Sequence, residues 1–373
     1  MIITVDKKGT VEEFNKAIHN VLKNKSVKGL LILACDSNEF TPANIDKHLK
    51  NINAPIFGGI FPQIIFGNEK LEHGTIVAGL SKKPDVHIVH NLSDASIEYE
   101  EMLDEQIPDT LKSKTMFVFV DGFSKRISAL IDSLFNIFGL EFNYIGGGAG
   151  SLNMHQKPCL FTNNGLLMDS AVLALLDIES GIGVCHGWEE ISGPYKVTES
   201  DRTEIKSLDW KPAFEVYREV VEKHSKKTIS KENFFDVAKC YPFGISRLGT
   251  EKIVRDPFVV GKDDSLICVG EVSEEAFVHI LTGDTSSLVK AAGKALALGE
   301  DAFHEKKVNK TIMFMDCISR VLFLEDNFKS ELNAVYDEKI PLIGALTIGE
   351  IANSGKDYLE FYNKTSVVGV MGD

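Results

Sequence analysis

The sequence predicts an α/β fold with mixed sheets, in which one βαβ unit plus a further strand occurs three times. Three features support this prediction: continuous apolar runs, helix-compatible stretches after them, and a second apolar run that contains glycine. Continuous apolar runs are typical of strands buried on both faces, and a helix of about 10 to 15 residues between two strands fits a parallel crossover. We expect the sheets to pack together with the helices outside.

The three copies have the same order of segments. Their first and second strands are KGLLILACDS (28–37) and APIFGGIFPQ (54–63), KTMFVFVDGF (114–123) and FNYIGGGAGS (142–151), and KTIMFMDCIS (310–319) and IPLIGALTIG (340–349). The copies align on Gly58, Gly146 and Gly344, and small loop insertions explain their different spacings. Another apolar strand follows each copy, at 74–80, 169–176 and 365–371. We expect these strands to return antiparallel, which makes the sheets mixed.

The segment between the second and third copies has a different pattern. Residues 181–210 and 243–283 alternate polar and apolar residues around turn residues, as in hairpins. A helix is predicted to begin at Pro212, and another to begin at Asp284 or Thr285, which are good N-cap residues. We place a domain boundary near Trp210, which divides the chain into residues 1–209 and 210–373.

Composition narrows the possible functions. The chain has 373 residues, 44% of them hydrophobic and 25% charged, which are globular values. Its 40 basic and 54 acidic residues give a net charge of −14, which disfavours nucleic acid as a partner. The apolar runs are too short to span a membrane, and the first residues lack the features of a signal peptide. We expect a cytoplasmic protein whose six scattered cysteines are reduced.

The most promising candidate site lies in the third copy. Cys317 and Arg320 end its first strand, and Gly349 and Glu350 follow its second. Parallel strands present their carboxyl ends at one sheet edge, where open α/β sheets bind ligands. Arginine is suited to a carboxylate or phosphate, and glutamate to an ammonium group. We therefore expect Arg320 and Glu350 to face one ligand pocket, with Glu271 and Arg255 as weaker additions; the alternative is an ion pair that closes the sheet edge.

Two further clusters are weaker candidates. The glycine run that includes Gly147 and Gly148 follows a strand, but no helix opens directly after it, as a phosphate-binding loop requires. These glycines either contact a ligand or let two backbones approach. His186 and Trp188 lie in a glycine-containing turn and line a pocket, bind haem iron or have a structural role. The hydrolase and kinase motifs that we considered are absent, and no catalytic or metal-binding constellation emerges.

The chain resembles the FIST family, named for F-box and intracellular signal transduction proteins, over some 300 residues. The likeness rests on the order of several short motifs, which are Phe57-Gly58-Gly59, Tyr144 to Ala149, His186-Gly187-Trp188, Tyr195 to Thr198, Pro212-Ala213 with Tyr217, Val254-Arg255, Cys317-x-x-Arg320, Gly349-Glu350-Ile351 and Asn363-x-Thr365. The chain departs from the family at Pro62-Gln63, where many relatives have Gly-Glu.

The resemblance implies two FIST-type domains and a sensory module that binds a small ligand, such as an amino acid, and signals through a separate protein. It also implies an alternative, a haem-containing nitric oxide sensor that partners a histidine kinase or a cyclic-nucleotide enzyme. A second alternative, from the residues themselves, is an enzyme that uses Cys317 as a nucleophile. A third is a scaffold in which Arg320 and Glu350 only pair with each other.

Overall fold

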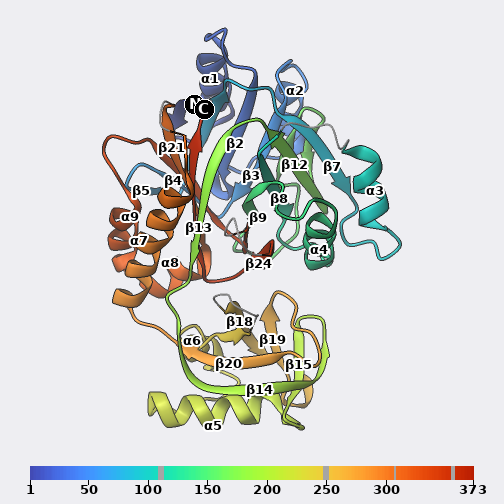
Figure 1. Cartoon of the computed structure of the whole chain (residues 1–373), viewed down its shortest axis with the longest axis vertical. Helices are drawn as coiled ribbons and strands as arrows, with labels where there is room; N and C mark the ends of the chain where they lie inside the picture. Colours follow the sequence, from blue (N-terminus) through green and yellow to red (C-terminus); the bar gives the residue numbers. More distant parts are fainter. Residues whose placement is uncertain (108–112, 247–251, 306–307, 354–357) are drawn as a thin grey trace.

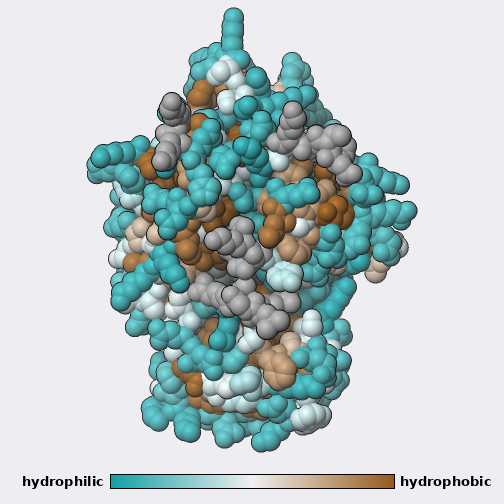
Figure 2. Space-filling model, in the orientation of Figure 1, coloured by the Kyte–Doolittle hydropathy of each residue, from teal (hydrophilic) through white to brown (hydrophobic). Residues whose placement is uncertain are grey.

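The computed structural model describes residues 1–107, 113–246, 252–305, 308–353 and 358–373. Three six-stranded mixed sheets form the main body, and a smaller unit lies below them in Figure 1. Helices lie on the outside of the three sheets (Figure 1). The predicted fold class is therefore confirmed. Hydrophilic side chains cover most of the face in Figure 2, and hydrophobic ones gather toward its centre.

Each sheet is built mainly from one copy of a longer repeat than the sequence predicted. The first copy contains β1 (Ile2–Asp6), α1 (Val11–Leu22), β2 (Gly29–Cys35), α2 (Pro42–Leu49), β3 (Ile56–Phe61), β4 (Gln63–Phe66), β5 (Glu69–Leu71) and β6 (Thr75–Leu80). The second contains β7 (Asp85–His90), α3 (Tyr99–Gln106), β8 (Thr115–Asp121), α4 (Ile127–Phe138), β9 (Asn143–Ala149), β10 (Leu160–Thr162), β11 (Gly165–Leu167) and β12 (Ser170–Leu176).

The third copy is interrupted by the smaller unit. It contains β13 (Glu179–Cys185), then α7 (Thr285–Ala302), β21 (Lys310–Cys317), α8 (Ile318–Leu324), α9 (Phe328–Val335), β22 (Leu342–Thr347), β23 (Glu350–Ala352), β24 (Glu360–Tyr362) and β25 (Ser366–Gly372). As expected, Asp284 caps α7, because its side chain accepts from the Ser287 amide.

The order of strands is the same in the three copies. The first strand of each predicted βαβ unit pairs in parallel with the second and antiparallel with the returning strand, as predicted. A leading strand, β1, β7 or β13, adds to the returning strand at the edge of each sheet. These leading strands lie outside the three copies predicted from the sequence, which begin at residues 28, 114 and 310.

The aligned glycines have one structural cause in all three copies. Each pairs in register with a residue of the neighbouring parallel strand, and a Cβ atom on it would lie between 1.8 and 1.9 Å from that residue's carbonyl oxygen. The pairs are Ile32 with Gly58, Val118 with Gly146, and Phe314 with Gly344. Only glycine fits such a close backbone approach.

Hairpins are exchanged between copies. The β4–β5 hairpin of the first copy extends the sheet of the third, β10–β11 of the second extends that of the first, and β23–β24 of the third extends that of the second. The three sheets are thus connected in a closed cycle. The chain ends also meet, since the Met1 amino group lies 3.0 Å from an Asp373 carboxylate oxygen.

The smaller unit, residues 189–282, is an insertion between β13 and α7. It contains β14 (Glu189–Asp201), β15 (Glu204–Leu208), β16 (Lys211–Pro212), α5 (Ala213–Ser225), α6 (Phe234–Ala238), β17 (Phe243–Ile245), β18 (Ile253–Val260), β19 (Leu266–Val269) and β20 (Phe277–Thr282). The predicted hairpins and the helix after Pro212 are present, although residues 247–251 of the second hairpin segment lie outside the described residues. Trp210 lies in the turn between β15 and β16.

Candidate functional site

A cavity of about 860 Å³ lies between the inserted unit and two of the three sheets. Its upper wall comes from the segments that follow β8, β9, β21 and β22, which are the carboxyl ends of two parallel strand pairs. Its lower wall comes from the β14–β15 turn, α6, β18 and β19. Ligand sites of open α/β sheets lie at such strand ends, and this volume is within the usual range for small-molecule sites.

The cavity wall is mainly apolar. Of the twelve large hydrophobic side chains that are exposed among the described residues, five line this cavity. They are Leu152, Met154, Phe235, Val259 and Leu322. Exposed apolar groups that gather at one concave site indicate a surface for binding.

Two of the predicted site residues line this cavity. Cys317, at the end of β21, and Gly349, between β22 and β23, both contribute to its wall. Gly349 has φ +83°, and a Cβ atom there would lie 2.2 Å from the Phe361 ring. Glu271 also lines the cavity, whereas Arg255 lines an adjoining pocket of about 450 Å³.

Arg320 lies behind the cavity wall rather than in it. It is in the first turn of α8, not in the strand, and its side chain is fully buried. Its Nε lies 3.0 Å from Glu331 Oε1 and 3.2 Å from Asp316 Oδ1. The other guanidinium nitrogens donate to the carbonyl oxygens of His186, Leu288 and Lys364. These protein groups use the hydrogen-bond donors of the Arg320 guanidinium. The sequence predicts that this group faces a ligand, and the structure instead places it against other protein groups.

Glu350 is likewise fully buried and is not among the cavity-lining residues. Its Oε1 accepts from the Thr347 hydroxyl at 2.6 Å, and its Oε2 accepts from the Thr365 amide at 3.3 Å. Burial raises the pKa of Glu350 to about 8, against the hydrogen bonds from Thr347 and Cys317, which lower it. Glu350 is therefore mostly protonated at neutral pH.

The surroundings of the Cys317 thiol bear on the alternative in which Cys317 is a nucleophile. Burial and the Glu350 carboxyl both raise its pKa well above the usual value, and backbone hydrogen bonds from Lys364 and Ser319 oppose that shift. A nucleophilic cysteine needs a lowered pKa, because the thiolate is the reactive form. The raised pKa thus disfavours the thiolate form of Cys317.

Gly147 and Gly148 let two backbones approach each other. Gly147 pairs in register with Glu350, and the Gly148 amide donates to the Gly349 carbonyl oxygen at 2.8 Å. A Cβ atom on Gly148 would lie 2.1 Å from the Ile348 carbonyl oxygen. Neither glycine is among the residues that line the cavity. Their contacts match the backbone-approach alternative of the sequence analysis.

His186 and Trp188 are connected by hydrogen bonds to each other and to the segment before β25. His186 Nδ1 accepts from the Trp188 amide at 2.8 Å, and Trp188 Nε1 donates to the Lys364 carbonyl oxygen at 3.1 Å. Trp188 lines a separate pocket beside the start of α7. Among the described residues, no histidine lines the large cavity, so a haem with a histidine axial ligand does not fit there.

Asn363 and Asp256 are site residues that the sequence analysis did not propose. Asn363 lines the cavity at 1% exposure, and neither its amide oxygen nor its amide nitrogen has a partner among the described residues. Asp256 lines it at 2% exposure, and its Oδ2 lies 3.2 Å from Lys364 Nζ. Burial raises the pKa of Asp256, and Lys364 and a hydrogen bond from the Ser319 side chain oppose that shift. Asn363 appeared in the sequence only as a family motif, and nothing in the strand pattern marked Asp256.

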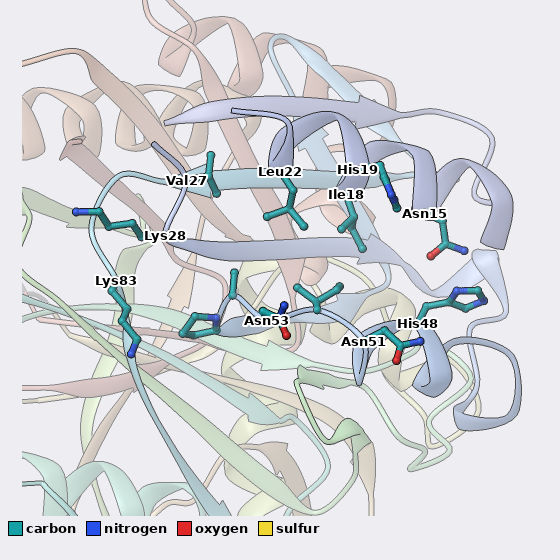
Figure 3. Close-up of a pocket in the computed structure, with 13 residues that line it drawn as sticks. Asn15, Ile18, His19, Leu22, Val27, Lys28, His48, Asn51, Asn53 and Lys83 are labelled. Carbon is teal, nitrogen blue, oxygen red and sulfur yellow. The ribbon is translucent and has the colours of Figure 1, made fainter. Parts of the chain in front are cut away.

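A second pocket of about 780 Å³ lies between α1 and α2, at the amino ends of β2 and β3 (Figure 3). Its labelled side chains include His19, His48, Lys28 and Lys83, which come from separate segments around its rim (Figure 3). None of the unpartnered buried side-chain atoms described for this chain belongs to a residue of this pocket. The cavity at the carboxyl ends is therefore the stronger candidate.

The chain therefore has a repeated α/β body and an inserted unit that lies over an apolar cavity at the strand ends. The chain belongs to the FIST family, since residues 29–211 match the FIST N domain and residues 213–353 match the FIST C domain. The family resemblance in the sequence is thereby confirmed. A comparison with curated proteins found no match. None of the described helices has both the length and the apolar character that crossing a membrane requires.

Proposed function

We propose that this protein is a sensory module that binds a small molecule in the cavity between the inserted unit and the carboxyl ends of the second and third copies. FIST domains are associated with sensing and signalling, which supports the general role. The observation that carries the proposal is the cavity itself, where exposed apolar side chains and buried polar atoms without described partners face one hollow.

The position of the cavity also supports a role in signalling. Its two walls belong to parts of the fold that the chain connects only through the β13–β14 and β20–α7 segments. A ligand that contacts both walls favours the arrangement in which they lie close together. Ligand binding then changes the position of the inserted unit relative to the sheets, which is the signal that a partner reads.

The proposal moves the ligand away from Arg320 and Glu350. An amino acid held by these two residues would have to displace Glu331, Thr347 and several backbone groups. Breaking a buried ion pair in this way costs about 3 to 5 kcal/mol. The large cavity requires no such rearrangement.

Native mass spectrometry tests the proposal after the purified protein is incubated with a small-molecule cell extract. We expect the protein to retain a small molecule and Val259→Trp, which puts an indole into the cavity wall, to retain much less. Leu298→Trp is the matched control, because Leu298 lies outside the cavity and is 41% exposed, against 40% for Val259. Equal retention by all three proteins, or none by any, would contradict the proposal.

A further inference from the structure

The proposed function leaves the kind of ligand open, and the cavity wall narrows it. Resting on that function, we propose that the cavity binds an amphipathic molecule with an apolar body and an uncharged head group that both donates and accepts hydrogen bonds, such as a carboxamide. Asn363 and Asp256 bind the head group, and the exposed apolar side chains bind the body.

The Asn363 amide defines the hydrogen bonds that the head group must make. Its Nδ2 is a donor and its Oδ1 is an acceptor, and both are buried at the cavity without a described partner. Leaving buried polar atoms unpaired is unfavourable, because each one has lost its hydrogen bonds to water. A ligand amide offers a carbonyl oxygen to Nδ2 and an N–H to Oδ1, which removes both costs at once.

Asp256 supplies a second acceptor close by. Asp256 pairs in register with Val269 of β19, and the next residue, Gly270, is beside Asn363, since a Cβ atom there would lie 3.2 Å from Asn363 Oδ1. Lys364, which follows Asn363, binds Oδ2 of Asp256, and the Ser319 side chain, which also lines the cavity, is a second donor to this carboxyl group; Oδ1 makes no hydrogen bond of ordinary geometry among the described residues. The second N–H of a primary amide suits this oxygen.

The charges at this end of the cavity favour a neutral head group. The Asp256 carboxylate and the Lys364 ammonium form a buried pair, so their net charge is zero. The Asp256 carboxylate would repel a ligand carboxylate. A ligand ammonium would compete with Lys364 for binding to the Asp256 carboxylate. The other cations of the lining, Lys125 and Arg202, have exposed side chains. Arg255 is buried beside Gly270 and Asn363, and its guanidinium donates to the carbonyl oxygens of Glu271, Val254 and Phe361.

The rest of the lining selects an apolar body. The apolar side chains exposed to this cavity are those of Leu152, Met154, Phe235, Val259 and Leu322. Covering such surface with a ligand is favourable in proportion to the apolar area that is removed from water. A head group without an apolar body forgoes that contribution, so small polar molecules such as urea or glycine are poor ligands for this cavity.

Isothermal titration calorimetry with four matched probes tests the inference. The probes are 4-phenylbutanamide, 4-phenylbutanoate, 4-phenylbutylamine and butanamide. We expect 4-phenylbutanamide to bind about tenfold more tightly than the acid or the amine, which fits the cost of buried polar atoms left unpaired. It should also exceed butanamide by about tenfold, because burial of a phenyl group has a free energy of similar size.

Two variants test whether Asn363 causes the preference for the amide and whether Leu322 binds the apolar body. In Asn363→Leu, which has nearly the same shape but no polar atoms, the amide should lose its advantage over the acid and the amine. This variant should not melt below the unmodified protein, because it removes two unpaired buried polar atoms. Leu322→Ala should weaken the three phenyl probes by a similar factor and leave their order unchanged.

The outcomes separate this inference from the proposed function. Tighter binding of the acid or the amine, binding of no probe, or an unchanged amide preference in Asn363→Leu would overturn the head-group assignment. The proposed function would then still be decided by the retention of an extract molecule in the Val259→Trp comparison. If Val259→Trp retains much less of the extract molecule and 4-phenylbutanamide binds most tightly of the four probes, both the proposed function and the head-group assignment are supported.

Discussion

For Arg320, the sequence predicts the position of the residue in the fold but not the partners of its side chain. The prediction that Cys317, Arg320, Gly349 and Glu350 gather at the carboxyl ends of a parallel pair follows from strand direction alone. The sequence does not show which side chain pairs with which. Glu331 of α9, eleven residues after Arg320, takes the guanidinium, and local periodicity gives no sign of that contact. Whether any of these residues contacts a ligand stays a prediction.

The buried carboxyl group of Glu350 makes stability depend on pH. Its pKa is about 8 in the folded chain, against 4.5 for the ordinary side chain. Between these values the folded state holds a proton that the unfolded state has lost, so stability falls as the pH rises. In Glu350→Gln the group stays neutral, and we expect this variant to lose less stability than the unmodified protein between pH 5 and pH 8.5.

Urea unfolding at pH 5, 6.5 and 8.5 measures this difference. Burial also raises the pKa values of Asp316, Glu331 and Asp256, but these groups are present in both proteins. Glu105→Gln, at an exposed position of α3, is the control and should follow the unmodified protein. Parallel pH profiles for the unmodified protein and Glu350→Gln would show that Glu350 does not titrate in this range.

At the scale of elements, the repeat was predictable because its signals are local. Apolar runs, the helices after them and the aligned glycines identified the parallel pairs and the returning strands in all three copies. The exchanged hairpins were not predictable in this way. β4 pairs with β22 across more than 270 residues, and β23 pairs with β9 across some 200. Such pairings depend on the packing of whole copies and leave no local pattern.

The glycine of the second copy provides a test of the repeat geometry. A Cβ atom on Gly146 would lie 1.8 Å from the Val118 carbonyl oxygen, which is backbone and cannot rotate away. We expect Gly146→Ala to lower the free energy of unfolding at the upper end of the roughly 1 to 3 kcal/mol typical of overpacking.

Gly293→Ala is the matched control for chemical denaturation. Gly293 is in α7, and the nearest atoms to an added Cβ are 3.7 Å away. Alanine is favoured over glycine inside a helix by about 1 kcal/mol, so this variant should be as stable as the unmodified protein or more so. Equal stability of Gly146→Ala and the unmodified protein would mean that β8 and β9 are farther apart than the structure shows.

At the scale of the whole molecule, the cycle of sheets and the insertion together create the cavity. Hairpin exchange connects the sheets of the second and third copies, and the segments that follow β8 and β21 line one cavity. β18 and β19 of the inserted unit form the opposite wall of this cavity. The alternating pattern of this segment was visible in the sequence, but its position over the strand ends depends on contacts between distant residues and leaves no local pattern.

A crystal structure of the protein with the molecule it retains is the most direct test. We expect that molecule to fill the space between the inserted unit and the second and third copies, with its polar end within hydrogen-bond distance of Asn363 and Asp256. A molecule bound instead between α1 and α2, or one that reaches Arg320 by displacing Glu331, would show that the ligand site has been placed in the wrong part of the fold.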